Sequence, residues 1–378
     1  MAKIIYLDNA ATSKVFPEVL DSYQRITTEY FANPSSIHAL GQKSARLLET
    51  SRAQILRTLK LDNHEVIFTS GATEANNLAI KGYCFANKTR GNHIITNAGE
   101  HPSVLNSILE MEQFGFEVTV LPLNDKGVVE VKDVVHALNK RTILVSLMAV
   151  NNETGAINPL EEIGEILKTY PKIVLHADMA QAIGKVPIPL DNIDLFTFAG
   201  HKIHGLQGSG ALIKKKNILL RAINAGGGQE YNLRSGTNTL ALSASLAKAL
   251  RLIVEQQKDN YQHIAKLRDR LLKYLNEHPD KYKLNSYFQA NPYIVNFSLL
   301  NRKASVVVEA LSNRNIMVSS LSACHSKKEK HSAVIYAMCQ NMQLAANTIR
   351  ISFSYENTLE EVDTLIANLE DILKEIKQ

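Results

Sequence analysis

Short runs of consecutive apolar residues alternate with segments whose apolar residues recur every three or four positions through the first half of the chain. The runs predict buried strands, and the recurring positions predict amphipathic helices. The predicted strands read IIYLD, EVIFTS, HIITN, FEVTVLPL, RTILVSLMAV, IVLHAD, DLFTFA and GALIKK. The predicted helices cover residues 36–60, residues from about 74 to 86, a segment in which Val104, Ile108 and Met111 share one face, and EEIGEILKTY. The segment before residue 36 is interpreted as a linker. This alternation predicts an α/β fold with a mostly parallel sheet covered by helices on both faces.

The pattern changes after the glycines at positions 226–228. A mainly helical region is predicted from about Thr239 to Asn276, followed by the strand YIVNFSLL, a helix around VVVEALSN, the strand NTIRISFS and a closing helix. Thr358 and Glu361 have the spacing of a capping box at the start of that last helix. These elements predict a second, α+β domain that begins near residue 256.

Composition narrows the class of protein. The chain has 378 residues, 45% of them hydrophobic, which is enough for one large core and a smaller one. A net charge of +5 is too small to indicate a nucleic-acid partner. Three cysteines do not make a disulfide framework and fit a reducing cytosol. The start MAKIIYLDNAATS has the features of neither a secretory signal nor a membrane anchor, and no apolar stretch approaches the roughly 20 residues that span a bilayer. We therefore expect a cytoplasmic protein that binds neither membrane nor nucleic acid directly.

Polar residues stand where two of the predicted strands end. One strand ends at Asp178, with Gln181 just after it, and the next ends at His201 and Lys202. The carboxyl ends of neighbouring parallel strands face one crevice. A lysine that can form an imine and an acid that can pair with a pyridinium nitrogen are what pyridoxal phosphate requires of a protein. A structural ion pair between Asp178 and Lys202 is the alternative.

Other strand ends carry further candidates. The turn Gly71-Ala72-Thr73 lies between a strand and a helix, where backbone N–H groups and a hydroxyl can hold a phosphate, although an ordinary capped turn explains it equally well. His101 follows a strand and can stack on a flat cofactor and move protons, or it is simply exposed. Asn152 is explained by turn chemistry alone. No single one of these residues decides the function.

Taken together, the motifs have a familiar order. YLDNAAT, NPSSIH, FTSGATEANNLAIKG, VNNETG, HADMAQAIGK, GHKIHG, GGGQE, RSGTNT, SSLSAC and IRISFS follow one another along nearly the whole chain. This series resembles the cysteine desulfurases of the NifS/IscS type, within the class-V aminotransferase family. The resemblance implies a fold-type I pyridoxal-phosphate-dependent transferase. It also implies a large cofactor domain over residues 15–255 and a small domain made of residues 1–14 and 256–378.

The resemblance assigns roles to individual residues. Lys202 would be the Schiff-base lysine, and His101 would stack on the ring and relay protons. Arg350 and Asn152 would bind the substrate, Arg350 as a bidentate fork on its carboxylate. The cofactor would be held by Ala72, Thr73, His101, Asn152, Asp178, Gln181, His201 and Lys202, with Thr237 from the other subunit of a homodimer.

Cys324 separates a desulfurase from a plain aminotransferase. Cys84 and Cys339 lie in apolar patterns and are interpreted as core thiols. Cys324 instead lies among serines and is followed by Lys327, Lys328 and Lys330, a setting that lowers the pKa of an exposed thiol. From the residues alone, a solvated surface loop explains this segment better than a reactive thiol does. The resemblance favours the nucleophile, on a mobile loop from about residue 322 to 330.

The implied reaction converts L-cysteine to L-alanine and leaves a persulfide on Cys324. The sulfur would pass to an acceptor, either an iron–sulfur scaffold or a tRNA-thiolating enzyme. A selenocysteine lyase or another pyridoxal-phosphate aminotransferase is the alternative activity. A sulfur-relay or scaffold-binding protein with a decayed site is the third possibility, which the presence of Lys202, Asp178 and His101 opposes.

A few positions depart from the family pattern. A serine that usually helps to hold the phosphate is replaced by Ala199, and a glycine of the cysteine segment is replaced by Leu321. Tyr231, Asn232 and His325 are further departures. These departures leave the reaction type intact. We expect them to affect the cofactor affinity, the rate and the choice of partner.

Overall fold

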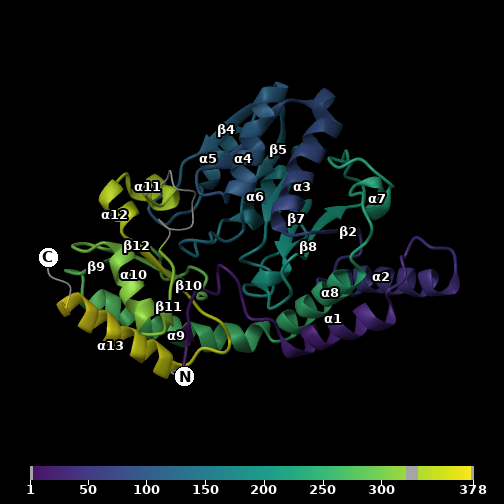
Figure 1. The fold of residues 1–378 in the computed structure, drawn as a ribbon. Coiled ribbons are helices and arrows are strands. Elements are labelled where there is room, and N and C mark those ends of the chain that lie inside the picture. Colours follow the sequence, from purple (N-terminus) through teal and green to yellow (C-terminus); the bar gives the residue numbers. More distant parts are fainter. Residues whose placement is uncertain (1–2, 321–330, 376–378) are drawn as a thin grey trace.

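The computed structural model describes residues 3–320 and 331–375. Its largest element is a seven-stranded sheet with the strand order β2-β8-β7-β6-β5-β3-β4 (Figure 1). The strands are β2 (His64–Thr69), β3 (His93–Asn97), β4 (Glu117–Leu121), β5 (Thr142–Ser146), β6 (Val174–Asp178), β7 (Leu195–Ala199) and β8 (Gly210–Lys215). Neighbours from β4 to β7 are parallel, and β8 runs antiparallel to both β7 and β2. The predicted α/β fold with a mostly parallel sheet is confirmed.

Alternate residues of each central strand enter different cores. In β7, Leu195 joins a cluster with helices α3 (Ala72–Asn87) and α4 (Pro102–Glu110), whereas Phe196 and Phe198 join the larger cluster on the opposite face. The larger cluster is covered by α1 (Pro17–Glu29), α2 (Ala39–Thr58), α6 (Leu160–Leu167) and α8 (Leu240–Glu255). The sheet is therefore buried on both faces, as continuous apolar strands require.

Helix α1 was not predicted, because the sequence before residue 36 was interpreted as a linker. Pro17 occupies the first turn of this helix, where its missing N–H costs nothing. Only Val19 and Ile26 are buried among its 13 residues, so the helical repeat is weak. Helix α1 is held mainly by packing against α8. The predicted helical region 239–276 is likewise two helices, α8 and α9 (Gln257–Glu277).

The C-terminal third forms a second layered unit. Strands β9 (Tyr282–Leu284), β10 (Ile294–Leu299) and β12 (Thr348–Ser352) make an antiparallel sheet packed with α9, α10 (Ala304–Asn313) and α13 (Leu359–Glu375). The N-terminal strand β1 (Ile5–Tyr6) pairs with β11 (Ile316–Met317) and shares this core (Figure 1). The predicted capping box is confirmed, with reciprocal hydrogen bonds of 3.3 Å between Thr358 and Glu361.

Shorter elements connect these layers. They are the helices α5 (Val131–Ala137), α7 (Gln229–Asn232), α11 (Ala333–Cys339) and α12 (Met342–Ala346), and the 3-10 turns Lys88–Arg90, Met111–Phe114 and Gly200–Lys202. Within residues 3–320 and 331–375, no helix combines the length and the apolar composition that a membrane span needs.

Candidate active site

Strands β6 and β7 bring the first two predicted residues to one edge of the sheet. They are parallel neighbours, with Asp178 in register with Thr197. Asp178 is the last residue of β6, and Lys202 lies in the 3-10 turn directly after β7. The edge therefore presents an acid and an amine from adjacent strands, the arrangement that the sequence pattern predicted.

The Asp178 carboxylate is buried and held by fixed donors. Its Oδ2 accepts from Nδ2 of Asn76 at 2.9 Å, and its Oδ1 accepts from the backbone N–H of Ala180 at 2.9 Å. Asn76 is itself fixed, because its Oδ1 accepts from Oγ1 of Thr197. Sequence reasoning missed Asn76. Its position could have identified it, because a polar residue stands on the buried face of α3, one turn after the predicted phosphate-binding turn.

Lys202 is held by the N-terminal segment. Its Nζ donates to the backbone oxygens of Ala10 and Ala11 at 2.6 and 2.7 Å. Gln181 Nε2 donates to the same oxygen of Ala10 at 2.9 Å. The predicted cofactor residues Gln181 and Lys202 therefore meet at one carbonyl group, which sequence reasoning had not placed in the site.

His101 is connected to Asp178 through two side chains. It precedes helix α4 as its N-cap, and its Nδ1 accepts from the backbone N–H of Ser103 at 3.1 Å and lies 2.8 Å from that residue's Oγ. Nδ2 of Asn76 donates to the same Oγ at 3.0 Å and also to Asp178. The imidazole is exposed, which leaves its ring accessible while its Nδ1 is fixed.

The buried carboxyl of Glu100 lies next to His101 in sequence and was also missed. Its Oε1 accepts from Asn97 Nδ2 at 2.5 Å and from the backbone N–H of Met148 at 2.6 Å. Burial and the nearby negative charge of Asp178 raise the pKa of Glu100 to about 8. Its Oε2 has no hydrogen-bond partner among the described residues. Glu100 is therefore neutral at pH 7.

The start of helix α3 faces open space. A Cβ added to Gly71 would meet no atom within 4 Å, and Ala72 and the exposed Thr73 open the helix. The first N–H groups of a helix have no partners within it and attract an anion. His201 is half-buried, and burial together with the positive charges of Lys202 and Lys185 lowers its pKa to about 4. The lowered pKa favours the neutral imidazole, which has one ring N–H, and the backbone of Ala11 is a hydrogen-bond partner of this ring.

Arg350 and Asn152 are brought together as predicted. Nη1 of Arg350 donates to the backbone oxygen of Asn152 at 2.9 Å, and its Nη2 donates to Oδ1 of Asp8 at 2.8 Å. Nε of Arg350 is buried and has no hydrogen-bond partner among the described residues. Two of the five N–H groups of this guanidinium are thus engaged, and Nε is satisfied by none of the described residues.

The structure does not join Thr237 to the other predicted residues. Thr237 is exposed, and none of the hydrogen bonds among the described residues links it to the site. Its segment is anchored nearby, because Arg234 pairs with Glu74 at 2.7 Å and Asn238 donates to Glu230 at 2.6 Å. Glu74 belongs to the first turn of α3, so this segment lies beside the predicted phosphate turn.

Cys324 lies outside the described residues, as do Leu321, His325 and the predicted mobile loop. The residues on both sides of that gap bond to the site. The backbone of Ser319 exchanges two hydrogen bonds with Arg350, at 3.2 and 2.8 Å. After the gap, Oγ of Ser332 donates to the carboxylate of Glu153, which follows Asn152 in the chain.

The other two cysteines differ from each other. Cys84 is buried, as predicted, and burial raises the pKa of its thiol. The prediction that Cys339 is a core thiol is wrong, because Cys339 is exposed at the end of the short helix α11. Its apolar neighbours Val334 and Ile335 face the core, while the last turn of the helix points to solvent.

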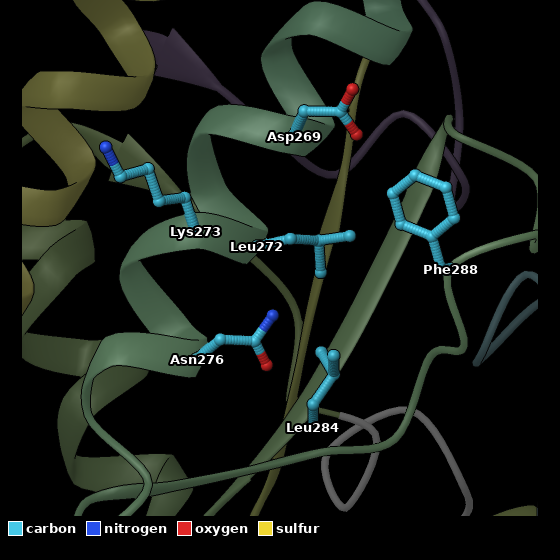
Figure 2. Close-up of a pocket in the computed structure, with 6 residues that line it drawn as sticks. All are labelled: Asp269, Leu272, Lys273, Asn276, Leu284 and Phe288. Carbon is cyan, nitrogen blue, oxygen red and sulfur yellow. The ribbon is translucent and has the colours of Figure 1, made fainter.

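A cavity of about 270 Å³ lies elsewhere, between α9 and the strand β9 (Figure 2). It is lined by Asp269, Leu272, Lys273, Asn276, Leu284 and Phe288. None of the predicted site residues lines it. Within the part of the chain that the structure describes, no group of three or more His, Cys, Asp or Glu side chains is arranged to hold a metal ion.

Comparison with known proteins identifies the family. The sequence model described as aminotransferase class-V matches residues 5–365. The chain belongs to this family. A NifS/IcsS protein homolog of Lactobacillus delbrueckii subsp. bulgaricus is 41% identical over 374 residues, which are 98% of this chain and 97% of that protein. Cysteine desulfurase IscS of Clostridium botulinum is 36% identical over 383 aligned positions, covering 100% and 96% of the two chains.

A solved structure of a NifS-like protein superimposes with a TM-score of 0.92 at 31% identity, covering 99% of this chain and 100% of the other. The predicted resemblance to the NifS/IscS group of class-V aminotransferases is confirmed over the full length, and so is the fold class.

Proposed function

We propose that this class-V family member is a pyridoxal-phosphate-dependent cysteine desulfurase, which converts L-cysteine to L-alanine and keeps the sulfur as a persulfide on Cys324. One observation carries the proposal beyond the family. The cysteine segment leaves the described fold at residues bonded to Arg350 and rejoins it at a residue bonded to Glu153. Cys324 is four residues after Ser320, a tether of at most about 14 Å. A thiol on this tether can reach a substrate held by Arg350.

The residues at the sheet edge fit pyridoxal phosphate. Asp178, fixed by Asn76, would pair with the pyridine nitrogen, and the start of α3 with Thr73 and His201 would hold the phosphate. Gln181 and Asn152 would contact the phenolic side of the ring. When bound, the cofactor supplies an electron sink for bond changes at the substrate's α-carbon.

The substrate would be oriented by its carboxylate. Arg350 has two donors engaged by Asn152 and Asp8 and a buried Nε with no partner among the described residues. A carboxylate that accepts from the remaining N–H groups of this guanidinium would gain charge-assisted hydrogen bonds. This position places the substrate between the strand β12, which carries Arg350, and the Asn152 turn.

Proton transfer would fall to Lys202 and His101. Lys202 Nζ faces two carbonyl oxygens, so its amine is oriented, and His101 keeps an accessible ring. The Cys324 thiolate would then attack the substrate's sulfur. An S–S bond forms while the C–S bond breaks, and the electron pair of the broken bond stays with the carbon skeleton, which is protonated to alanine.

The deciding experiment replaces the nucleophile. The purified Cys324→Ser protein should keep the yellow colour of the bound cofactor and lose sulfide release from L-cysteine. Cys339→Ser is the matched control, because Cys339 is an exposed thiol outside the proposed site, and it should retain full activity. Sulfide release by Cys324→Ser at the wild-type rate would refute the desulfurase.

The same preparations test the alternatives. A selenocysteine lyase or an aminotransferase needs no persulfide on Cys324, so trapping a persulfide there after incubation with L-cysteine excludes both as the main activity. A sulfur-relay protein with a decayed site would be purified without the yellow colour. The presence of Lys202, Asp178 and the Gln181 amide in one bonded region supports a competent site.

We also propose that the protein is a homodimer. Phe31, Ile37 and Leu40, between α1 and the start of α2, are 74%, 91% and 51% exposed, which is unusual for three large apolar side chains in one short stretch. A partner that covers them would also bring the exposed Thr237 of one subunit near the other's phosphate site. Light scattering after size exclusion should give twice the 42.0 kDa chain mass.

The sulfur acceptor is proposed from charge. Lys327, Lys328 and Lys330 follow Cys324 closely and favour an acidic docking face on an iron–sulfur scaffold or a tRNA-thiolating enzyme. Transfer to the acceptor should weaken with salt and with charge reversal of these lysines, while alanine release without acceptor changes little. Because persulfide transfer requires reduced thiols, we propose that the protein works in the cytoplasm.

A further inference from the structure

Lys185 is a buried lysine that the proposed reaction does not use. It lies after β6, and only 5% of it is exposed. Its Nζ donates to Oε1 of Gln181 at 2.9 Å and lies 5.9 Å from the centre of the Tyr293 ring. None of the ion pairs among the described residues includes Lys185. A buried ammonium group without a carboxylate partner is costly for a fold.

A second buried lysine shows the usual solution. Lys214 in β8 is equally buried, at 5% exposed, but its Nζ pairs with the carboxylate of Glu65 at 2.6 Å. Lys185 instead lies near the positive charges of Lys202 and Arg350. Burial and these two charges lower its pKa to about 7. The lowered pKa favours the neutral amine, so Lys185 adds no ion pair to the stability of the fold, and its polar contact is the hydrogen bond to Gln181.

That contact fixes the orientation of an amide. The amine of Lys185 donates to Oε1 of Gln181, while the backbone oxygen of Ala10 can only accept and takes a hydrogen from Nε2. Only one of the two amide orientations satisfies both neighbours. Nε2 carries two hydrogens, so one remains after the bond to Ala10. The nitrogen that carries this second hydrogen, Nε2 of Gln181, donates to the same Ala10 oxygen as Nζ of Lys202.

We propose that Lys185 is a positioning residue that holds the Gln181 amide with its NH₂ group toward Lys202, so that Gln181 donates to the cofactor's phenolic oxygen. This inference rests on the proposed function, because it presumes pyridoxal phosphate at the sheet edge. Without Lys185, one of the two constraints on the amide is lost. The oxygen of Ala10 would then be the one remaining constraint, and any fraction of the amide that flips would direct Oε1 at both Ala10 and the phenolic oxygen.

The test measures cofactor binding and colour as well as turnover. Lys185→Met keeps the length of the side chain and removes the donor. Apo protein with this change should bind pyridoxal phosphate about tenfold more weakly, the loss expected for one hydrogen bond. When the loaded protein is titrated with pH, the midpoint at which its visible absorption band changes should differ from that of the wild type. Lys214→Met is the matched control, and it should lower the unfolding midpoint without changing the affinity or the band.

A double-mutant cycle separates positioning from general damage to the fold. If Lys185 acts through Gln181, then Lys185→Met should add no further loss of affinity in a Gln181→Leu background. Equal losses with and without Gln181, or a loss no larger than that of Lys214→Met, would overturn the proposal.

A second variant covers the case in which Lys185→Met does not fold. Gln181→Glu keeps an acceptor for Lys185 but has no hydrogen to donate when ionised. It should bind the cofactor at least as weakly as Lys185→Met and unfold no more easily than the wild type, because it gives Lys185 a carboxylate partner. Unchanged affinity in Gln181→Glu would overturn the proposal. Failure of the wild-type protein to bind pyridoxal phosphate would instead refute the proposed function.

Discussion

The ends of β6 and β7 lie side by side, yet they are built differently. At the end of β6, Asp178 is held by donors from α3, which packs on the same sheet, and from its own following turn. At the end of β7, Lys202 is held by Ala10 and Ala11, which belong to the other end of the chain. The acid is therefore positioned by the sheet itself, whereas the orientation of the amine depends on how the N-terminal segment docks.

This difference separates two requirements of the site. A buried carboxylate needs fixed donors, since an unsatisfied one costs several kcal/mol. A lysine that exchanges partners during a reaction needs acceptors that can be given up, and the oxygen of the buried Ala10 keeps its hydrogen bond from Gln181 when Lys202 leaves it. The N-terminal segment also supplies Asp8 for Arg350, so one segment contacts both the amine and the proposed substrate site.

Removal of the amine should have the largest effect. Lys202→Ala is expected to lower alanine formation from L-cysteine by about a thousandfold or more, because general acid–base catalysis contributes about 10²–10⁴. Alanine release measures it. Lys215→Ala is the control. Lys215 lies on the neighbouring strand β8 and pairs with Asp194, and its replacement should keep the wild-type rate. A loss of less than tenfold in Lys202→Ala would exclude Lys202 as the reacting amine.

At the other strand end, Asp178→Asn should lower the rate about a hundredfold and the free energy of unfolding by about 1–3 kcal/mol, since an amide must turn its NH₂ toward one of two donors. Urea unfolding and alanine release measure the two effects. Asp194→Asn, which also loses a bond to a backbone N–H, should affect stability alone. If both variants retain activity, the acid at β6 has only a structural role.

The role of the N-terminal segment is tested through Asp8. Asp8→Asn removes the negative partner of Arg350, and we expect KM for L-cysteine to rise about fivefold with little change in kcat, because ground-state binding is affected. Steady-state kinetics measure both. Glu356→Gln is the control. It removes the exposed ion pair between Lys14 and Glu356 and should change neither KM nor kcat. A fall in kcat with constant KM would contradict this role.

The smallest effect concerns the buried neighbour of Asp178. Because folding raises the pKa of Glu100 from 4.5 to about 8, the folded state binds more protons than the unfolded state between these values. Glu100 therefore contributes stability at low pH that is lost as the pH rises toward 8. Glu100→Gln should flatten the fall of the urea midpoint between pH 5 and 8. An unchanged slope would show that Glu100 is ionised in the folded protein.

Much of the fold could be predicted because its strands are buried on both faces and read as continuous apolar runs. Helix α1 could not, since only Val19 and Ile26 are buried and its stability comes from packing on α8. Among the site residues, Asp178 and Lys202 were found because each ends a strand. Asn76 and Glu100 were missed because a polar residue on a helix face or in a turn gives no sign of what lies beside it.

The sequence by itself determined the α/β class, the mostly parallel sheet and the residue types at the strand ends, because local apolar patterns specify strands and helices. Only the tertiary structure decided that Ala10 receives Lys202 and Gln181, that Asp8 and Asn152 share Arg350, and that Lys185 is buried behind the Gln181 amide. These contacts join residues up to hundreds of positions apart. They depend on packing and on the satisfaction of buried polar groups, which no local pattern records.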